Sequence, residues 1–159
     1  MTVPATGRVV ALDLGTRRVG VAVTDTARSV ALARDAFVRS GDRDGDLERL
    51  AALVVDTGAT VVVVGLPLSL DGSRGPAARA AADEAASLAR SLAAVAGEGA
   101  PPVELFDERL TTVSAANQLA AAGRDSRERR SRVDSAAACV LLEAWLAGRR
   151  RATTAGPGR

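Results

Sequence analysis

The chain has 159 residues, 47% of them hydrophobic and 25% charged, which is the composition of one globular domain of ordinary size. It contains no histidine, and all 21 basic residues are arginine because no lysine occurs in the sequence. These absences exclude catalysis by Ser-His-Asp or Cys-His groups, histidine metal sites, a Walker-type phosphate loop and a lysine Schiff base. The formal net charge of +2 is too small to establish a polyanionic partner by itself.

The sequence leads us to expect no signal for secretion or for membrane insertion. Residues 1–7 lack the basic-then-apolar pattern of a signal peptide, and no apolar run approaches the length of a membrane span. The single cysteine, Cys139, cannot form a disulfide within the chain. We therefore expect a cytoplasmic protein with no membrane contact, organised as a short N-terminal extension (1–7), one domain (8–147) and a flexible basic tail (148–159).

The N-terminal part of the chain is predicted to form three strands. Residues 8–14 (RVVALDL) are a valine-rich apolar run, and residues 18–24 (RVGVAVT) follow after a tight connection, which is typical of an antiparallel hairpin. A third strand is expected within residues 30–38. The loop at 40–46 consists of turn-forming residues.

Helices and strands alternate in the rest of the chain. Asp46 is expected to cap a helix that ends near Gly58, and the β-branched run at 60–64 predicts a central strand buried on both faces. Antiparallel strands followed by this alternation indicate an α/β fold, with a mixed sheet and helices on its faces. The remaining predicted elements are an alanine-rich helix (74–96), a short strand (103–106), a helix capped by Thr111 or Thr112, and a final helix (133–146).

Acidic residues occur at the ends of predicted strands, where open α/β sheets collect their chemistry. Asp13 lies in an otherwise apolar strand, and its charge requires compensation by a metal ion or by pairing with Arg17 or Arg18. Asp107 and Glu108 are adjacent at the end of a later strand, so only one of them can readily point toward Asp13.

A further acid, Asp134, lies in the first turn of the final predicted helix. The helix dipole stabilises an acid at that position, so Asp134 alone does not indicate a metal site. The candidate ligands as a group supply only oxygen atoms, which favours a hard cation such as Mg²⁺ or Mn²⁺.

Arginines flank these acids and are candidate phosphate contacts, with solvated surface charge as the alternative. Arg17 and Arg18 border the end of the first strand, and Arg109 follows the acidic pair. The polar, arginine-rich segment 123–132 is expected to be a mobile loop that clamps a nucleic-acid substrate. The nucleic-acid-binding candidates are Arg17, Arg18, Arg109, Arg129, Arg130 and Arg132.

The order of these motifs resembles the YqgF/RuvX family. The similarity rests on DLGTRRVG at 13–20, GLPLSLDG at 65–72, DERLTT at 107–112 and VDSAA at 133–137, and it covers residues 9–146. The resemblance implies a ribonuclease H-like fold, with a five-stranded mixed sheet in the order 3-2-1-4-5 flanked by helices.

The same resemblance implies a function. Members of the family are described as pre-16S rRNA nucleases and as Holliday-junction-resolvase-like proteins, and their carboxylate cluster corresponds by position to Asp13, Glu108 and Asp134. Asp107 is an alternative or additional metal ligand beside Glu108. We therefore expect an endonuclease dependent on Mg²⁺ or Mn²⁺ that processes the 5′ end of pre-16S rRNA in ribosome biogenesis.

Two other functions compete with this prediction. A Holliday junction resolvase would use the same metal site on branched DNA, and symmetric cleavage would require a homodimer, so a strict monomer would count against it. A non-catalytic RNA-binding factor in rRNA maturation or transcription would depend on arginine contacts, because only 2% of the residues are aromatic and could stack on bases. Retained binding without cleavage under any metal would favour that factor.

Overall fold

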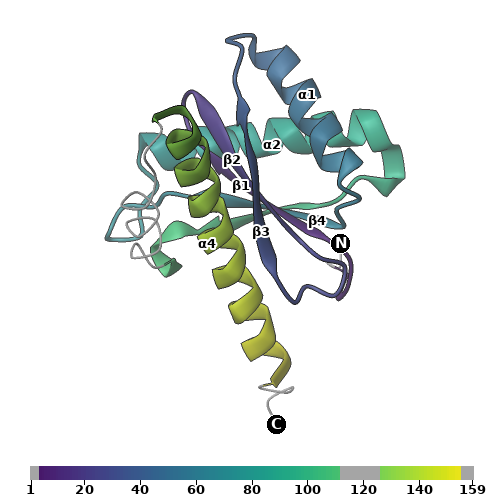
Figure 1. Cartoon of the computed structure of the whole chain (residues 1–159). Coiled ribbons are helices and arrows are strands. Elements are labelled where there is room, and N and C mark those ends of the chain that lie inside the picture. Colours follow the sequence, from purple (N-terminus) through teal and green to yellow (C-terminus); the bar gives the residue numbers. More distant parts are fainter. Residues whose placement is uncertain (1–3, 112–125, 155–159) are drawn as a thin grey trace.

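A mixed five-stranded sheet forms the centre of the protein in the computed structural model, which describes residues 4–111 and 126–154, with 126–134 described by their backbone alone (Figure 1). The strands lie in the order β3-β2-β1-β4-β5. The pairs β1–β2 and β2–β3 are antiparallel, whereas β1–β4 and β4–β5 are parallel. This topology confirms the predicted sheet. The strands are β1 (Val9–Leu14), β2 (Arg18–Thr24), β3 (Ala31–Val38), β4 (Val61–Leu66) and β5 (Val103–Asp107).

Helices cover both faces of the sheet (Figure 1). The helices α1 (Arg43–Asp56) and α2 (Pro76–Ala96) pack on one face, and α4 (Ser126–Thr154) packs on the other. Two short 3₁₀ helices, η1 (Gly97–Gly99) and η2 (Glu108–Leu110), precede and follow β5. No helix of the described segments combines the length and the apolarity that a membrane span requires.

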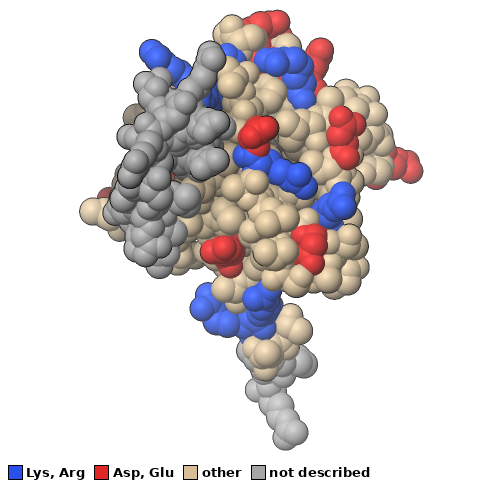
Figure 2. Space-filling view, viewed as in Figure 1, with Lys and Arg blue, Asp and Glu red and all other residues tan. Residues whose placement is uncertain are grey.

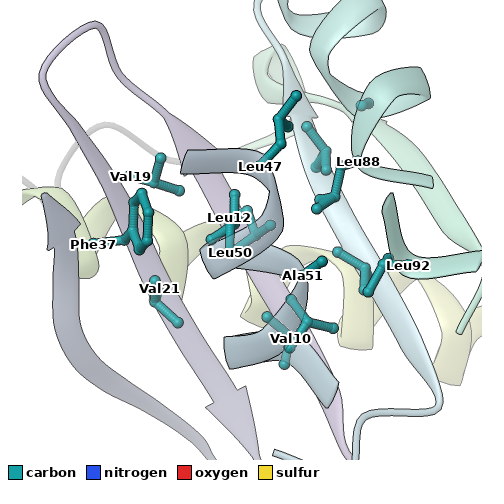
Figure 3. Packing of buried hydrophobic residues seen from close by; sticks show 14 of the residues in the cluster. Val10, Leu12, Val19, Val21, Phe37, Leu47, Leu50, Ala51, Leu88 and Leu92 are labelled. Atoms are coloured by element: carbon teal, nitrogen blue, oxygen red, sulfur yellow. The ribbon is translucent and has the colours of Figure 1, made fainter. Parts of the chain in front are cut away.

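The alternation of side chains along the strands produces two cores. On one face, Val10 and Leu12 of β1 pack with Leu50 of α1 and Leu88 of α2, all buried (Figure 3). Neighbouring residues in the strands point to the other face, where Val9, Ala11 and Val63 pack against Leu142 and Trp145 of α4. Because both of its faces are covered, β4 is a continuous apolar run, as its sequence predicted, and β1 is apolar apart from Asp13.

The start of α1 differs from the prediction. The helix begins at Arg43 with Asp42 at the N-cap, so the expectation that Asp46 caps it is wrong. Asp46 is instead buried in the first turn, where its carboxylate accepts hydrogen bonds from the backbone N (3.0 Å) and Oγ (2.7 Å) of Ser40. These bonds to the charged form lower the pKa of Asp46 to about 2. The acid therefore fastens the preceding loop to the helix.

The final helix is longer than predicted in both directions. Its backbone is helical from Ser126 to Thr154, so residues 126–132 are not part of a loop, and residues 148–154 continue the helix into the segment assigned to a flexible tail. Arginine and glutamate are good helix formers, and no glycine or proline interrupts residues 126–132. The helix expected after Thr111 or Thr112 lies outside the described residues, as do residues 123–125.

Candidate active site

Asp13 lies between two glycine positions on the α4 face of the sheet. It follows Ala11 on that face, because successive side chains of a strand alternate. Its partner in β2 is Gly20, and on the other side the register places Leu12 beside Val64, so that Gly65 comes next in β4. Neither neighbouring strand presents a side chain beside Asp13, and this leaves room for a second functional group.

Glu108 occupies the space over Gly65. A Cβ atom built on Gly65 would lie only 3.0 Å from both Cγ and Cδ of Glu108 and would overlap its carboxylate oxygen. The strand β5 delivers Glu108 to this point, because Leu66 of β4 pairs with Asp107 immediately before it. Because Gly65 has no side chain, the Glu108 carboxyl group can lie over β4 and reach Asp13 at the carboxyl end of β1.

The Glu108 and Asp13 carboxyl groups are in direct contact. Burial, the charge of Asp13 and a hydrogen bond with Asp13, together with the charge of Asp107, raise the pKa of Glu108 to about 7. Two carboxylates that share one site cannot both ionise freely, so one of them retains a proton well above its ordinary range. Of the two adjacent acids that the sequence left open, Glu108 is the one that meets Asp13.

Asp107 has a different set of contacts. Its carboxylate accepts bonds from the backbone N (2.9 Å), Nε (3.0 Å) and Nη2 (2.7 Å) of Arg109, which lower the pKa of Asp107. The Nη1 atom of Arg109 also donates to the Leu70 carbonyl at 3.3 Å. Asp107 and Arg109 thus connect the end of β5 to the loop between β4 and α2.

Asp134 lies in the helical part of α4 whose side chains are not described, and Arg129, Arg130 and Arg132 lie there too. The next residue, Ser135, is buried, and its hydroxyl bonds to the backbone N of Val21 (3.5 Å) and to the Arg34 carbonyl. These bonds hold α4 against β2, one residue from the glycine that pairs with Asp13. Where side chains are described, no group of three Asp, Glu or Cys residues is placed to hold a metal ion.

Arg17 and Arg18 flank the β1–β2 turn, with Arg17 exposed and Arg18 half-buried at the start of β2. Gly15 is required in this turn, since a Cβ there would lie 2.5 Å from the Arg18 carbonyl. The turn begins directly after Asp13, and the backbone N of Gly15 donates a hydrogen bond to the Asp13 carbonyl at 3.0 Å. Its conformation therefore affects both the acid and the two arginines.

Sequence reasoning missed the pair that holds this turn. Arg39 donates through Nε to the Gly15 carbonyl (2.8 Å) and through its backbone N to the Arg17 carbonyl (3.0 Å). Its other guanidinium nitrogens form an ion pair with Glu84 of α2, at 2.6 and 3.1 Å. Both side chains of the pair are only 19% exposed. Arg39 and Glu84 are far apart in the sequence, and no motif links them.

We expect Arg39→Gln to lower the free energy of unfolding by about 2 kcal/mol, because charge-assisted hydrogen bonds contribute more than neutral ones and Glu84 would lose its partner. Urea unfolding measures the change. Arg90→Gln, on the exposed side of α2 with a hydrogen bond to Ser87 alone among the described contacts, is the matched control and should stay within about 0.5 kcal/mol of wild type. Equal effects of the two substitutions would mean that Arg39 does not stabilise the turn.

Comparisons with known proteins agree with the fold and with the motifs. A family model described as "RuvX: Holliday junction resolvase" matches residues 7–148. A relative from Mycobacterium sp. (strain KMS), named "Putative pre-16S rRNA nuclease", is 43% identical over 155 residues, covering 98% of this chain and 88% of its own. A relative of the same name from Kineococcus radiotolerans is 46% identical over 149 residues, covering 94% of this chain and 75% of its own.

Two solved structures share the architecture at low sequence identity. RuvC of Thermus thermophilus aligns with a TM-score of 0.52 and 15% identity, covering 90% of this chain and 96% of RuvC. The yeast mitochondrial Holliday junction resolvase Ydc2 aligns with a TM-score of 0.55 and 11% identity, covering 96% of this chain and 83% of Ydc2. The fold is therefore ribonuclease H-like, as the resemblance implied.

Proposed function

The chain belongs to the RuvX family, and on that premise we propose that it is a metal-dependent endonuclease that processes the 5′ end of pre-16S rRNA. The family and the names of the relatives support a nuclease. The observation that carries the chemistry is the contact between Asp13 and Glu108, in which Glu108 holds a proton near neutral pH. The rRNA substrate comes from the names of the relatives. Processing of an rRNA precursor would take place in the cytoplasm.

The residues present fit a divalent cation. A cation would remove the repulsion between Asp13 and Glu108, and Gly20 of β2 presents no side chain beside Asp13. Oxygen ligands of this kind suit Mg²⁺ or Mn²⁺. Asp13 and Glu108 would hold the ion together with Asp134, whereas Asp107 is the weaker candidate because it is bonded to Arg109. When bound, the cation lowers the pKa of the attacking water and stabilises charge on the departing 3′ oxygen.

The chain's own groups perform the remaining tasks in this proposal. Glu108 must release its proton before it can act as a ligand, so metal affinity should rise with pH toward and above 7. Arg17 and Arg18 would bind phosphates beside the scissile bond. Arg109, 37% exposed while bonded to Asp107, would add a contact from the end of β5. The products would carry a 5′-phosphate and a 3′-hydroxyl.

A second candidate function is supported by the family description itself, which names Holliday junction resolvases. The same carboxylates would then cut branched DNA, and two sites in a homodimer would be needed for symmetric cleavage. The rRNA nuclease has no such requirement and could act as a monomer. The two functions therefore predict different substrates and different assembly states.

Cleavage assays separate these functions. The substrates are a labelled RNA that carries the 5′ leader of the small-subunit rRNA and a four-way DNA junction, each with Mg²⁺, Mn²⁺ or EDTA. We expect wild type to cut the RNA with metal and not with EDTA, and Asp13→Asn to cut neither substrate. Cutting of the junction alone would establish the resolvase. Binding of RNA without cutting under any metal would favour a non-catalytic RNA-binding factor, and equal cutting by Asp13→Asn would refute the assigned site.

A further inference from the structure

A cluster of arginines lies at the end of the sheet opposite the carboxylates, around the C-terminal end of α4. Arg8 precedes β1 and Thr60 precedes β4, and their backbones are bonded at 2.8 Å, so this end is defined by the start of both parallel strands. Figure 2 shows the basic side chains gathered there. We call this group the distal arginine cluster; its members are Arg28, Arg149, Arg150 and Arg151.

The distal arginine cluster is built into the fold. Arg28 donates to the carbonyls of Gly7 (2.8 Å) and Thr6 (3.1 Å), and Arg150 donates to the Arg28 carbonyl at 3.1 Å. The guanidinium groups of Arg28 and Arg149 both lie over the ring of the buried Trp145, 5.6 and 4.7 Å from its centroid. Cations held on an aromatic ring lose little freedom when they bind a ligand.

The positive charge of the cluster is only partly neutralised. Glu104 accepts bonds from Arg149 (3.1 Å) and from Nε1 of Trp145 (3.2 Å). Among the residues that the structure describes, Arg28, Arg150 and Arg151 form no ion pair. Burial and the charge of Arg149 lower the pKa of Arg28, as expected where like charges are held together. Such an excess of arginine suits an anionic partner with several charges.

Helix α4 connects this cluster to the active site. Position 134 of α4 precedes Ser135, which bonds the helix to β2 near Asp13. From position 134 to position 150 an α-helix advances about 24 Å. That length corresponds to about seven base-pair steps of 3.4 Å. A single duplex that lies along α4 could therefore contact both ends.

We propose that the distal arginine cluster is a second nucleic-acid contact, which binds backbone phosphates of a duplex whose scissile bond lies at Asp13 and Glu108. This inference rests on the proposed function for the identity of the polyanion. It deepens that function by assigning the enzyme to substrates with a double-stranded segment next to the cut. Substrates too short to span the roughly 24 Å along α4 would not reach the cluster.

Arg150→Gln with Arg151→Gln tests the proposal, because Arg150 and Arg151 are exposed and lie outside the Trp145 packing. Binding is measured in the Asp13→Asn background with two hairpins, whose duplexes extend about 4 or about 15 base pairs beyond the expected cut, that is, about 14 or about 50 Å. The protein with both substitutions should bind the long hairpin about five- to tenfold more weakly than the protein that keeps Arg150 and Arg151. The slope of its log affinity against log salt should fall by about 1.8, because two phosphate contacts are lost.

The short hairpin should be unaffected, and Arg43→Gln with Arg90→Gln, which removes two exposed charges from α1 and α2, should change neither affinity. Unchanged binding of the long hairpin, or equal weakening of both hairpins, would overturn the second contact. Because the readout is binding, it is independent of cleavage. Failure of wild type to cut would refute the proposed nuclease while a length-dependent loss would still establish the cluster.

Discussion

Replacing Glu108 with glutamine should abolish cleavage and, in the absence of metal, raise the free energy of unfolding at pH 8 by about 1–3 kcal/mol. Loss of a group that supports a metal ligand costs roughly 10- to 100-fold in affinity or activity, so loss of a ligand itself should cost at least about 100-fold. The gain in stability has a separate origin. Glutamine keeps the shape of Glu108 and cannot ionise, so the repulsion with Asp13 disappears.

The sign of the pH dependence follows from the direction of the shift. The folded protein binds the Glu108 proton more tightly than the unfolded chain, since the pKa rises from 4.5 to about 7 on folding. The contribution to stability is fully present below pH 4.5 and is lost as the pH rises to about 7, with a slope of at most about 1.4 kcal/mol per pH unit. Glu108 is partly accessible to solvent, so the total loss is smaller than the full product of slope and interval.

Urea unfolding in EDTA between pH 4.5 and 8.5 measures this effect. The curves of wild type and Glu108→Gln should coincide at the acid end and diverge as the pH rises. Mg²⁺ or Mn²⁺ should then stabilise wild type at pH 8 and have little effect on the variant. Glu98→Gln, in the exposed η1 helix, is the control and should follow wild type throughout. Parallel curves for wild type and Glu108→Gln would mean that Glu108 and Asp13 do not compete for a proton.

The sheet could be predicted from the sequence because its strands are distinct apolar runs. The β-branched run of β4 and the short turn between β1 and β2 have simple physical causes, and the family resemblance added the strand order. Helix boundaries were harder to predict. The polar, arginine-rich sequence of 126–132 suggests a loop, although its residues favour the helix that they form, and Asp46 is a buried acceptor where its position suggests a cap.

The candidate site could be predicted only down to its residue types. The alternation of a strand showed that Asp107 and Glu108 cannot both face Asp13, but it could not show which one does. The answer depends on the register between β4 and β5 and on the empty position at Gly65, which are relations between distant residues. The same holds for Arg39 and Glu84, whose pairing follows from the placement of α2 against the β1–β2 turn.

Gly65→Ala should abolish cleavage and metal-induced stabilisation while leaving the unfolding free energy in EDTA within about 1 kcal/mol of wild type. The new methyl group would occupy the space of the Glu108 carboxyl group, which is the end of a flexible side chain and can move away. The backbone of Gly65 does not require glycine, because its φ is not among the positive ones. The substitution therefore acts on Glu108 and leaves the strand intact.

Three measurements identify this mechanism. In Gly65→Ala, the loss of stability between pH 4.5 and 7 should shrink, because a displaced Glu108 regains a pKa nearer to its ordinary value. Any destabilisation should vanish when Glu108→Ala is combined with it, since the overlap is then gone. Gly148→Ala, at an open helical position, should keep full activity and gain up to about 1 kcal/mol. A Gly65→Ala protein that still cuts and still responds to Mg²⁺ would exclude the carboxyl group above Gly65 from the site, and with it the central role of Glu108.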